Sequence, residues 1–575
     1  MAFDTHSLFG YSLVDSVVSQ AANILVFNVQ AGHGTRFAIN QQITIWPIGA
    51  NPTLDNAMIC RITGIVGDQI TASYVVGNRE GSNIRTVQAG DQVYNSITPK
   101  TFTDIETQIS NPTKAFVTVG YSNADYIVDG IADDVQIQAA IDAATALGGG
   151  IVYLKEGTYN LTNNNPNPAF QQVYTGSLYA CILLKDKVTL KGAGIGKTIL
   201  NLASFVGGLP LGQGCNVIVN SAVGQSQQGV MDMSITMPAF SVSAGAYGRC
   251  LNFAGVNHLT LQNLYLYRGS WAVFGNTYSW DNVNKILTTD TRDIIVEKVI
   301  ADTFKDSSML FNLIRARVLH CTYLTSYDDA LLVAQSGRDI LIDGTSFDGD
   351  STHVGSATAH IYVFNDNSLT TDKNALSDIR IINNSIRNLN TLIGESSGVV
   401  IRKAVKVKIN DNLIEGNLGH GIYNVSEGNL QDIIIKGNTI RKNGGYGIKL
   451  PITVGGGGFI NSIIQANSIY NNTTYGIYVE TAAAAGTCDG LTISNNEIYD
   501  DQGAGATQAN GLGLHIGVVT FANLVASMNN IHDTATPYDI SVYGGATLTG
   551  GILYMDAGAL KYRGGGGTTT IIAAA

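Results

Sequence analysis

A short pattern is repeated six times between about Asp378 and Asp533. Each copy has an apolar residue, two small or polar residues, Asn, any residue and a second apolar residue. The intervals between consecutive asparagines are 28, 26, 29, 29 and 33 residues. Self-similarity at such a period predicts a solenoid. The repeated asparagines are Asn384, Asn412, Asn438, Asn467, Asn496 and Asn529.

The residues of each copy favour strands over helices. The copy from Ile435 to Ile440 is short and rich in β-branched residues, and it shows no helical rhythm of 3.6 residues. This excludes the helical repeat folds and predicts a parallel β-helix, whose coils stack about 4.8 Å apart. At each turn, Asn is expected to bond its own backbone and the Asn of the next coil, as in amide ladders. We therefore interpret these asparagines as structural.

The charge of the chain excludes several classes of partner. Only 13% of its 575 residues are charged, against about 25% in an average protein, and a stack of apolar coils with Gly turns accounts for the deficit. A net charge of −11 argues against nucleic acid or an anionic membrane surface as partner. Because no apolar run reaches the roughly 18 residues of a spanning helix, membrane insertion is not expected.

The N-terminus and the cysteines indicate where the chain is made. The first six residues lack the basic and apolar parts of a secretory signal. The six cysteines are widely spaced and form no C-x-x-C pair, so we expect buried free thiols in a chain folded in a reducing cytosol.

Composition and turn residues divide the chain into five parts. Residues 1–22 are expected to be a short helix or an anchoring arm, and residues 23–110 a small β-domain with Gly and Asn-Pro turns. Residues 111–162 form a neck and a helix, and residues 163–545 form the solenoid. Residues 546–575 are a Gly- and Thr-rich tail.

The expected helix closes the open end of the solenoid. Asp133 or Asp134 can cap it, and Gly148 to Gly150 end it. Its position would hide an apolar rung and an edge prone to pairing. An apolar stripe is predicted on one helix face at Val135, Ile137, Ala140, Ile141 and Ala144.

Three segments resemble known families. Residues 75–105, with Arg79 and Ala89-Gly90-Asp91, resemble a module of bacteriophage tail proteins. Residues 129–159 resemble the entry of the pectate-lyase-like β-helix superfamily, and residues 558–573 resemble the end of several phage tail and virion proteins. The fold expected is thus all-β, a right-handed parallel β-helix with an N-terminal capping helix, preceded by a small β-domain.

These resemblances imply a phage tail spike. Residues 1–110 would attach it to other tail or baseplate proteins, and the β-helix would meet a host surface polysaccharide. The superfamily resemblance implies a homotrimer. Virion proteins are assembled in the host cytoplasm, which agrees with the missing signal peptide.

One cluster of residues has the spacing of a catalytic site. Asp306 and Asp328 are 22 residues apart, and Asp329 and His353 are 24 apart, about one coil each. Side chains one coil apart lie about one strand spacing apart, so these four residues can converge on one face. Neighbouring carboxylates raise each other's pKa, which suits a general acid and a general base.

The order of these residues resembles that of the polygalacturonase-type glycoside hydrolases. Asp306 matches the first Asp, Asp328 and Asp329 match the pair, and His353 matches the histidine, although its flanking glycines differ. Arg380 falls near the arginine of the R-I-K motif, but the lysine is missing. An intact Gly419-His420-Gly421 lies about three coils too late. The alternative is that Asp328 and Asp329 form a polar turn and bond backbone N–H groups.

Further residues are candidates for binding. Tyr327, Arg380, Glu395 and Arg402 are expected to line a sugar groove. Asp348, Asp350 and their neighbours offer oxygen atoms of the kind that calcium takes, but Asp-Gly-Asp-Ser alone does not identify such a site. We therefore predict no metal and no cofactor.

Two classes of function remain open at this stage. The tail spike is either a depolymerase that cleaves a surface polysaccharide, with a hydrolase favoured over a lyase, or an adhesin that holds glycan without cleaving it. A cellular polysaccharide lyase or C5-epimerase is a third reading. It predicts an export signal, which the sequence does not show.

Overall fold

The computed structural model divides into two compact units, residues 1–113 and 114–575. The residues it describes are 11–21, 24–39, 42–50, 57–74, 86–94, 115–162, 165–166, 177–204, 214–238, 248–276, 278–281, 286–289, 291–304, 306–311, 313–326, 328–334, 337–349, 359–365, 376–389, 396–425, 430–452, 459–481, 488–503, 507–517, 520–542, 547–549, 552–556, 559–563 and 569–573.

The N-terminal unit contains a closed barrel with the strand order β1-β2-β5-β4-β3-β6. Its core includes the fully buried side chains of Leu25, Phe27 and Ile43. The strands are β1 (Tyr11–Gln20), β2 (Ile24–Val29), β3 (Gln42–Trp46), β4 (Met58–Val66), β5 (Gln69–Tyr74) and β6 (Gln92–Tyr94).

The predicted helix or arm over residues 1–22 is wrong for Tyr11–Gln20. This segment is a barrel strand that pairs antiparallel with both β2 and β6. Its alternation is irregular because the register shifts twice along β2, between Val14 and Ser16 and again between Val17 and Ser19. The irregular pattern hid the strand in the sequence.

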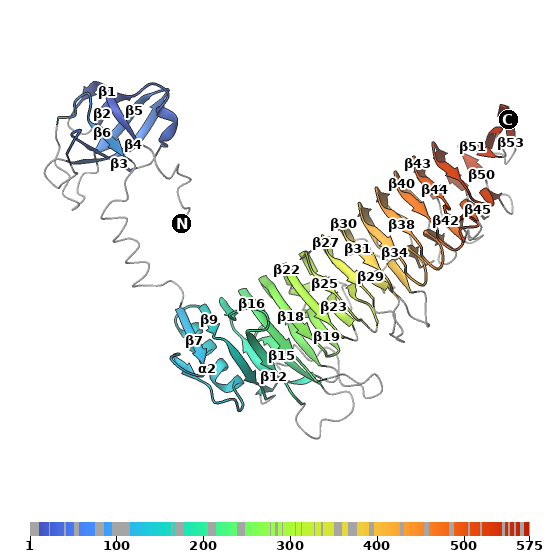
Figure 1. Ribbon diagram of the computed structural model, residues 1–575, viewed down its shortest axis with the longest axis horizontal. Helices are drawn as coiled ribbons and strands as arrows, with labels where there is room; N and C mark the ends of the chain where they lie inside the picture. Colours follow the sequence, from blue (N-terminus) through green and yellow to red (C-terminus); the bar gives the residue numbers. More distant parts are fainter. Residues whose placement is uncertain are drawn as a thin grey trace. The chain divides into compact units, whose positions relative to one another are not determined.

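Helix α2 (Asp134–Ala146) closes the first coil of the second unit, as predicted (Figure 1). Ile137, Ala140, Ile141 and Ala144 join the apolar core of the solenoid. Val135 does not belong to the stripe, because 55% of it is exposed.

The two aspartates at the start of α2 do not cap it through their side chains. Asp133 accepts hydrogen bonds from the backbone N–H groups of Gly130 and Asn160, and Asp134 accepts one from that of Thr162. These carboxylates therefore tie the helix to the first coil of the solenoid.

The second unit is a parallel β-helix whose coils follow one another along its axis (Figure 1). A typical coil has a long strand, β27 (Arg338–Asp343), a short strand, β28 (Ser346–Asp348), and a third strand, β29 (Ala359–Phe364). The long and short strands belong to one sheet, and the third strands form a separate sheet of 14 described strands. We call the latter the third-strand sheet.

The third-strand sheet follows the sequence order. Its members are β11 (Asn165–Pro166), β12 (Ser177–Leu184), β15 (Gly214–Asn220), β17 (Arg249–Ala254), β19 (Trp271–Asn276), β23 (Asp306–Phe311), β26 (Leu331–Ala334), β29, β32 (Ser397–Arg402), β35 (Ile422–Asn424), β39 (Ile448–Ile452), β42 (Tyr475–Thr481), β45 (Asn510–Ile516) and β49 (Thr536–Val542).

The sheet of long and short strands covers the remaining sides of the coils. Its long members include β9 (Gly150–Leu154), β13 (Val188–Lys191), β16 (Ser226–Thr236), β18 (Asn257–Tyr267), β22 (Thr291–Asp302), β24 (Leu313–Leu319), β30 (Ser377–Ile382), β33 (Val405–Asn410), β37 (Ile434–Lys436), β40 (Phe459–Gln465), β43 (Cys488–Ser494) and β47 (Val525–Ser527). Its short members include β10 (Gly157–Asn160), β14 (Thr198–Asn201), β25 (Thr322–Tyr323), β31 (Ser385–Arg387), β34 (Leu413–Glu415), β38 (Thr439–Arg441), β41 (Ser468–Tyr470), β44 (Glu497–Tyr499) and β48 (Asn530–His532).

Coil pairing continues into the predicted C-terminal tail. Strands β50 (Thr547–Thr549) and β51 (Ile552–Asp556) still pair parallel with the preceding coil. Strands β52 (Ala559–Arg563) and β53 (Thr569–Ala573) then turn back antiparallel. The solenoid therefore extends about ten residues beyond the expected boundary at residue 545.

The predicted asparagine ladder is confirmed. From Asn384 to Asn529, each side-chain amide donates to the side-chain oxygen of the Asn on the next coil, at 2.8–3.0 Å. The same oxygen accepts the backbone N–H of the preceding Asn, for example from Asn412 to Asn438 at 3.0 Å. The ladder lies at the turn between long and short strands.

A second ladder, which the sequence analysis missed, lies at the turn before the third strand. Asn417, Asn443, Asn472 and Gln508 are linked by side-chain hydrogen bonds of 2.9–3.1 Å. The signal was present, because in three consecutive coils a second Asn follows the first by five residues.

The described residues include all six cysteines and helix α2 of the second unit. All six cysteines are free and buried, as predicted, and Cys181 and Cys215 stack on consecutive coils with their sulfurs 3.8 Å apart. Within the described residues, no helix is both long and apolar enough to cross a membrane.

Candidate functional site

The predicted acids lie at the start of strands in the third-strand sheet. Asp306 is the first residue of β23, where it pairs with Trp271 of β19. The register of β23 on β26 joins Ser308 to Leu331, and extending it back by two residues brings Asp306 level with Asp329. The two positions are therefore equivalent on consecutive coils. The sequence spacing predicted this relation between Asp306 and either Asp328 or Asp329.

The Asp329 side chain already has a partner in the fold. It is 6% exposed, and its Oδ1 accepts the backbone N–H of Ala359 on the next coil at 3.1 Å. Its backbone oxygen accepts the hydroxyl of Ser326 at 3.0 Å. The carboxylate thus stabilises the turn before β26 and lies one coil from Asp306. The adjacent Asp328 is half-buried.

The other predicted residues are distributed over different faces. Arg402 ends β32 of the third-strand sheet, and its guanidinium lies 4.8 Å from the ring centre of Phe364. Arg380 is on β30, in the other sheet, so it is not brought together with the acids. Tyr327, His353 and Glu395 lie outside the described residues.

The residues considered for calcium have other contacts. Asp348 forms an ion pair with Arg387 at 3.4 Å and accepts a hydrogen bond from the Asn388 amide at 2.8 Å. Asp350 lies outside the described residues.

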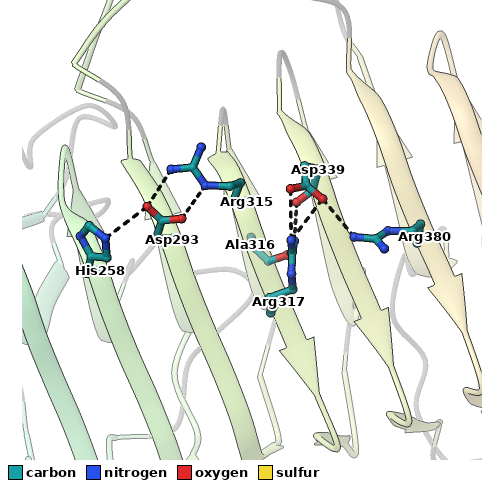
Figure 2. A network of polar contacts seen from close by, with 7 residues as sticks. All are labelled: His258, Asp293, Arg315, Ala316, Arg317, Asp339 and Arg380. Carbon is teal, nitrogen blue, oxygen red and sulfur yellow. Dashed lines mark hydrogen bonds and ion pairs between the residues drawn. The ribbon is translucent and has the colours of Figure 1, made fainter. Parts of the chain in front are cut away.

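Arg380 belongs to a charged network on the outer face of the long strands (Figure 2). Asp339 accepts hydrogen bonds from both Arg317 and Arg380, at 3.1 and 3.0 Å. Two coils away, Asp293 pairs with Arg315 at 2.6 Å and with His258 at 3.5 Å (Figure 2). These pairs neutralise one another, which points to a structural role for most of the network.

A shallow hollow of about 580 Å³ opens beside this network. It is lined by three acidic, three basic and one apolar side chain, so its charges balance. The lining residues are Asp339, Asp378, Arg380, Lys406, Lys408, Asp432 and Ile434.

The most coherent set of binding groups lies on the third-strand sheet, from β35 to β49. Register pairing aligns Tyr423, Lys449, Tyr478, Gly513 and Asp539 on consecutive coils. Inward-facing residues such as Ile422 and Ile448 alternate with them and are fully buried. We call the outward set the aromatic strip: His420, Tyr423, Tyr446, Lys449, Tyr475, Tyr478, His515 and Asp539.

The rings of the strip pack into a continuous row, in which Tyr423 and Tyr478 are only 8% and 9% exposed. Tyr446 lies between His420 and Tyr475, with centroid distances of 5.1 and 5.6 Å. Tyr478 packs against both Tyr475 and Tyr446 at tilts of 50° and 42°. Aromatic faces next to hydrogen-bonding tips are suited to a ligand that is apolar on one side and polar on its edge.

One end of the strip is a hydrogen-bonded group around Asp539. Its Oδ2 accepts the hydroxyl of Tyr475 at 2.5 Å and a bond from His515 Nε2 at 2.9 Å. The hydrogen bond from Tyr475, followed by that from His515, lowers the pKa of Asp539. Nδ1 of the same imidazole lies 3.3 Å from the hydroxyl of Tyr478.

The other end of the strip is cationic. The Lys449 ammonium lies 5.0 Å from the ring centre of Tyr423 and 5.2 Å from that of Tyr446. It is also 3.4 Å from Nε2 of His420. Burial, and then the charge of Lys449, lower the pKa of His420 to about 3.

The sequence carried a signal for the strip that was not used. In three coils the outward residue directly follows Gly-Ile, at Gly421-Ile422-Tyr423, Gly447-Ile448-Lys449 and Gly476-Ile477-Tyr478. These glycines are required by packing. A Cβ on Gly447 would lie 2.5 Å from the backbone oxygen of Gly476. The Gly-Ile pair thus marks the turn, and the residue after it faces outward.

A second aromatic column, on the short strands, is better explained by stability. Tyr470 and Tyr499 stack with centroids 4.7 Å apart and planes 8° apart, and His532 continues the stack at 5.0 Å. Arg441 closes the column by donating to the hydroxyl of Tyr470. Each ring covers the face of its neighbour, as Tyr446 and Tyr475 of the strip also do. The column differs from the strip in its cation, because Arg441 is already paired with Glu415 at 2.6 Å.

Comparison with known proteins gives a match to the family described as right handed beta helix region, over residues 304–453. The match agrees with the predicted right-handed parallel β-helix. Among curated proteins, the mannuronan C5-epimerase AlgE4 of Azotobacter vinelandii is 47% identical over 75 residues. This stretch covers 13% of the chain and 12% of that enzyme, so the chain matches only a small part of its relative's length.

Two solved structures illustrate the likeness of fold. The tailspike protein of E. coli bacteriophage HK620, solved in complex with a hexasaccharide, is 13% identical with a TM-score of 0.49, covering 85% of this chain and 86% of its own. The A-module of the mannuronan C-5 epimerase AlgE6 of Azotobacter vinelandii is 17% identical with a TM-score of 0.45, covering 74% and 97%.

Proposed function

We propose that this protein is a phage tail spike that binds a host surface polysaccharide along the third-strand sheet. The observation that carries the proposal is the aromatic strip, which places rings and hydrogen-bonding groups on consecutive coils of one face. The resemblance of residues 75–105 and 558–573 to phage tail proteins supports the location in a virion. Attachment to other tail proteins would then use the N-terminal unit.

The strip and the predicted acids belong to the same sheet. Strands β23 and β35 are separated by β26, β29 and β32 in the strand order, which corresponds to about 19 Å along the axis. Tyr362 and Phe364 of β29, whose ring centroids are 5.0 Å apart, lie between these two regions together with Arg402. A polysaccharide lying along the axis would reach all of them.

Hydrolysis of the bound polysaccharide is the reaction we propose. Asp306 and Asp329 would act as general acid and general base, with Asp328 and His353 beside them and Tyr327, Glu395 and Arg402 contacting sugar. The distance between the two reacting carboxylates would decide the stereochemistry. A separation of roughly 6.5–9.5 Å gives inversion, and about 5–5.5 Å gives retention.

The first experiment incubates the purified protein with capsule and lipopolysaccharide from candidate hosts. We expect new reducing ends without the absorbance of an unsaturated sugar. Asp329→Asn keeps the oxygen that accepts the Ala359 N–H but removes the acid, so it should lower turnover at least 100-fold and leave the fold intact. Asp306→Asn should do the same. Absorbance of an unsaturated product would contradict hydrolysis.

A non-cleaving adhesin is the second candidate, and the bond from Ala359 to Asp329 favours it. In that case the carboxylate is a turn residue, as the alternative reading of the sequence held. Glycan binding would then persist in Asp306→Asn and Asp329→Asn, with no turnover in the wild type. Tyr478→Ala should weaken binding for either function, because both use the strip.

A further inference from the structure

Lys449 is at the centre of the cationic end of the aromatic strip, and its partners are unusual. Within the described residues, its contacts are the rings of Tyr423 and Tyr446 and the imidazole of His420. None of the carboxylates in the described part of the chain forms an ion pair with it. An ammonium that is partly surrounded by rings loses hydration. A negatively charged hydrogen-bond acceptor would restore the lost interaction.

The contacts of His420 determine which of its nitrogens carries the proton. The backbone N–H of Tyr446 donates to Nδ1 at 3.1 Å, so Nδ1 presents its lone pair. In a neutral imidazole the proton is then on Nε2. The ring stays neutral at neutral pH because burial and the charge of Lys449 lower its pKa to about 3.

Two hydrogen-bond donors therefore face each other. Nε2–H of His420 and the ammonium of Lys449 are separated by 3.4 Å, and a lysine ammonium has no lone pair to accept a bond. Neither group can satisfy the other. An oxygen atom placed between them would accept from both, and a negatively charged oxygen would do so most strongly.

We propose that His420 and Lys449 bind the carboxylate of an acidic sugar in the polysaccharide. This inference rests on the proposed function and specifies its substrate class. One carboxylate oxygen would accept from Nε2 and the other from the ammonium, while the sugar ring lies against Tyr446 and Tyr475. The site thus selects a polymer that contains uronic acid or another carboxylated sugar.

Two carboxylates of the described chain lie near the strip. Asp539, at the other end of the strip, is already held by Tyr475 and His515. Glu480 follows Tyr478 by two residues; burial, and then the charge of Glu480, raise the pKa of Tyr446. Tyr446 therefore remains a neutral hydroxyl beside the bound carboxylate.

The test compares each acidic polymer with its own carboxyl-reduced form. The full-length protein is applied to an array of bacterial capsular polysaccharides, and the bound uronate polymers are also prepared with their carboxylates converted to primary alcohols. We expect the acidic form to bind at least tenfold more tightly than the reduced form. Reduction leaves phosphate and sulfate groups in place, so it separates carboxylate recognition from recognition of those anions.

Variants at Lys449 test whether this site causes the preference for the acidic polymer. Lys449→Met keeps the apolar stem and should remove the preference for the acidic form, whereas Lys449→Arg should retain most of it. Lys436→Met, at an exposed lysine of β37, is the matched control and should leave binding unchanged. Circular dichroism of each variant reports whether the fold is intact.

The two proposals fail in different ways. Equal binding of acidic and reduced polymers, weakened in both by Tyr478→Ala, would overturn the carboxylate site and leave the proposed function standing. An unchanged acidic preference in Lys449→Met would also overturn the site. Absence of binding to every polysaccharide of the array would overturn both.

Discussion

Single residues at the turns adopt the left-handed backbone conformation. The free-energy cost of this conformation depends on the side chain. The residue before each ladder Asn has φ between 54° and 69° at Asp411, Gly437, Ala466, Asn495 and Met528. Gly, Asn and Asp tolerate this region, and other residues are destabilised there by roughly 1–2 kcal/mol. The turns with Ala466 and Met528 are therefore less stable than they would be with Gly, Asn or Asp at the same position.

Met528→Asn and Ala466→Asn should each increase the free energy of unfolding by about 0.5–1 kcal/mol, because Asn adopts the left-handed region more easily. Met528 is 81% exposed, so its replacement removes little packing. Urea denaturation followed by circular dichroism measures the change. Val525→Asn, on strand β47 of the same coil, is the control and should give no gain.

A buried histidine, His360, and a half-buried one, His420, should make the protein sensitive to mild acid. Burial lowers the pKa of His360 to about 4 and that of His420 to about 3, below the value near 6.5 of an unfolded chain. Below that value the unfolded state binds more protons. Stability is therefore complete above about pH 6.5, and each histidine reduces it by up to about 1.4 kcal/mol per pH unit as the pH falls toward 4.

The check is urea denaturation at a series of pH values between 7 and 4. His360→Gln should flatten the pH dependence by the contribution of one histidine, whatever it does to stability at pH 7. The double variant His360→Gln/His420→Gln should flatten it further. An unchanged slope in the single variant would show that His360 is protonated in the folded protein.

At the scale of elements, the two amide ladders hold consecutive turns in register. Each Asn in the middle of a ladder serves several groups, and Asn438 is an example. Its oxygen accepts both the backbone N–H and the side-chain amide of Asn412. Its own amide donates to Ile409 and Asn467. Removing one member therefore takes hydrogen-bond partners from polar groups on both neighbouring coils.

Asn438→Ala should lower the free energy of unfolding by about 2–5 kcal/mol, because buried donors and acceptors lose their partners at about 1–3 kcal/mol each. Asn529→Ala, at the more exposed end of the same ladder, should cost clearly less. Chemical denaturation of both variants gives the comparison. Similar losses at the two positions would mean that the ladder bonds contribute little beyond local turn structure.

At the scale of the whole molecule, the two units have separate apolar cores. The barrel core consists of residues from Val14 to Val93, and the solenoid core begins at Ala115. Each unit therefore has the contacts to fold without the other. In the homotrimer that the superfamily resemblance implies, each chain would contribute both units.

A fragment of residues 114–575 should fold cooperatively and bind the same polysaccharide as the full chain, because the strip and its supporting coils are all within it. Calorimetry and the polysaccharide array test the two parts of this prediction. Sedimentation of the full chain should give three times the mass of 60.8 kDa. A monomeric mass would contradict the proposed trimer.

The sequence predicted the parts of the fold that recur. The period of Asn384 to Asn529 identified the solenoid because every coil needs the same turn chemistry at the same place. Strand β1 was missed because its register on β2 shifts twice and blurs the alternation. Val135 was misplaced because it precedes Ile137 by two residues, about 200° around the helix, and therefore lies on the opposite face.

The site was harder to predict for a physical reason. Asp306 and Asp329 were identified from one coil spacing, and the pairing of Ser308 with Leu331 two residues further on is consistent with equivalent positions. Their catalytic role stays a prediction. The strip was missed because its residues differ from coil to coil, as Tyr, Lys, Tyr, Gly and Asp do at one register position. The preceding Gly-Ile pair marks this position in three coils, but it does not say which residue types gather there. The three-dimensional register brings the members of the strip together.

Within each coil, the positions that stabilise the fold differ from those that face outward after Gly-Ile. A mutation at Lys449, the half-buried outward residue of β39, changes the outer surface while both ladders and the isoleucine core remain. Under the proposed function, single substitutions of this kind would change which polysaccharide is bound without compensating mutations in the coils. The repeated coils keep the fold stable while the outward residues change.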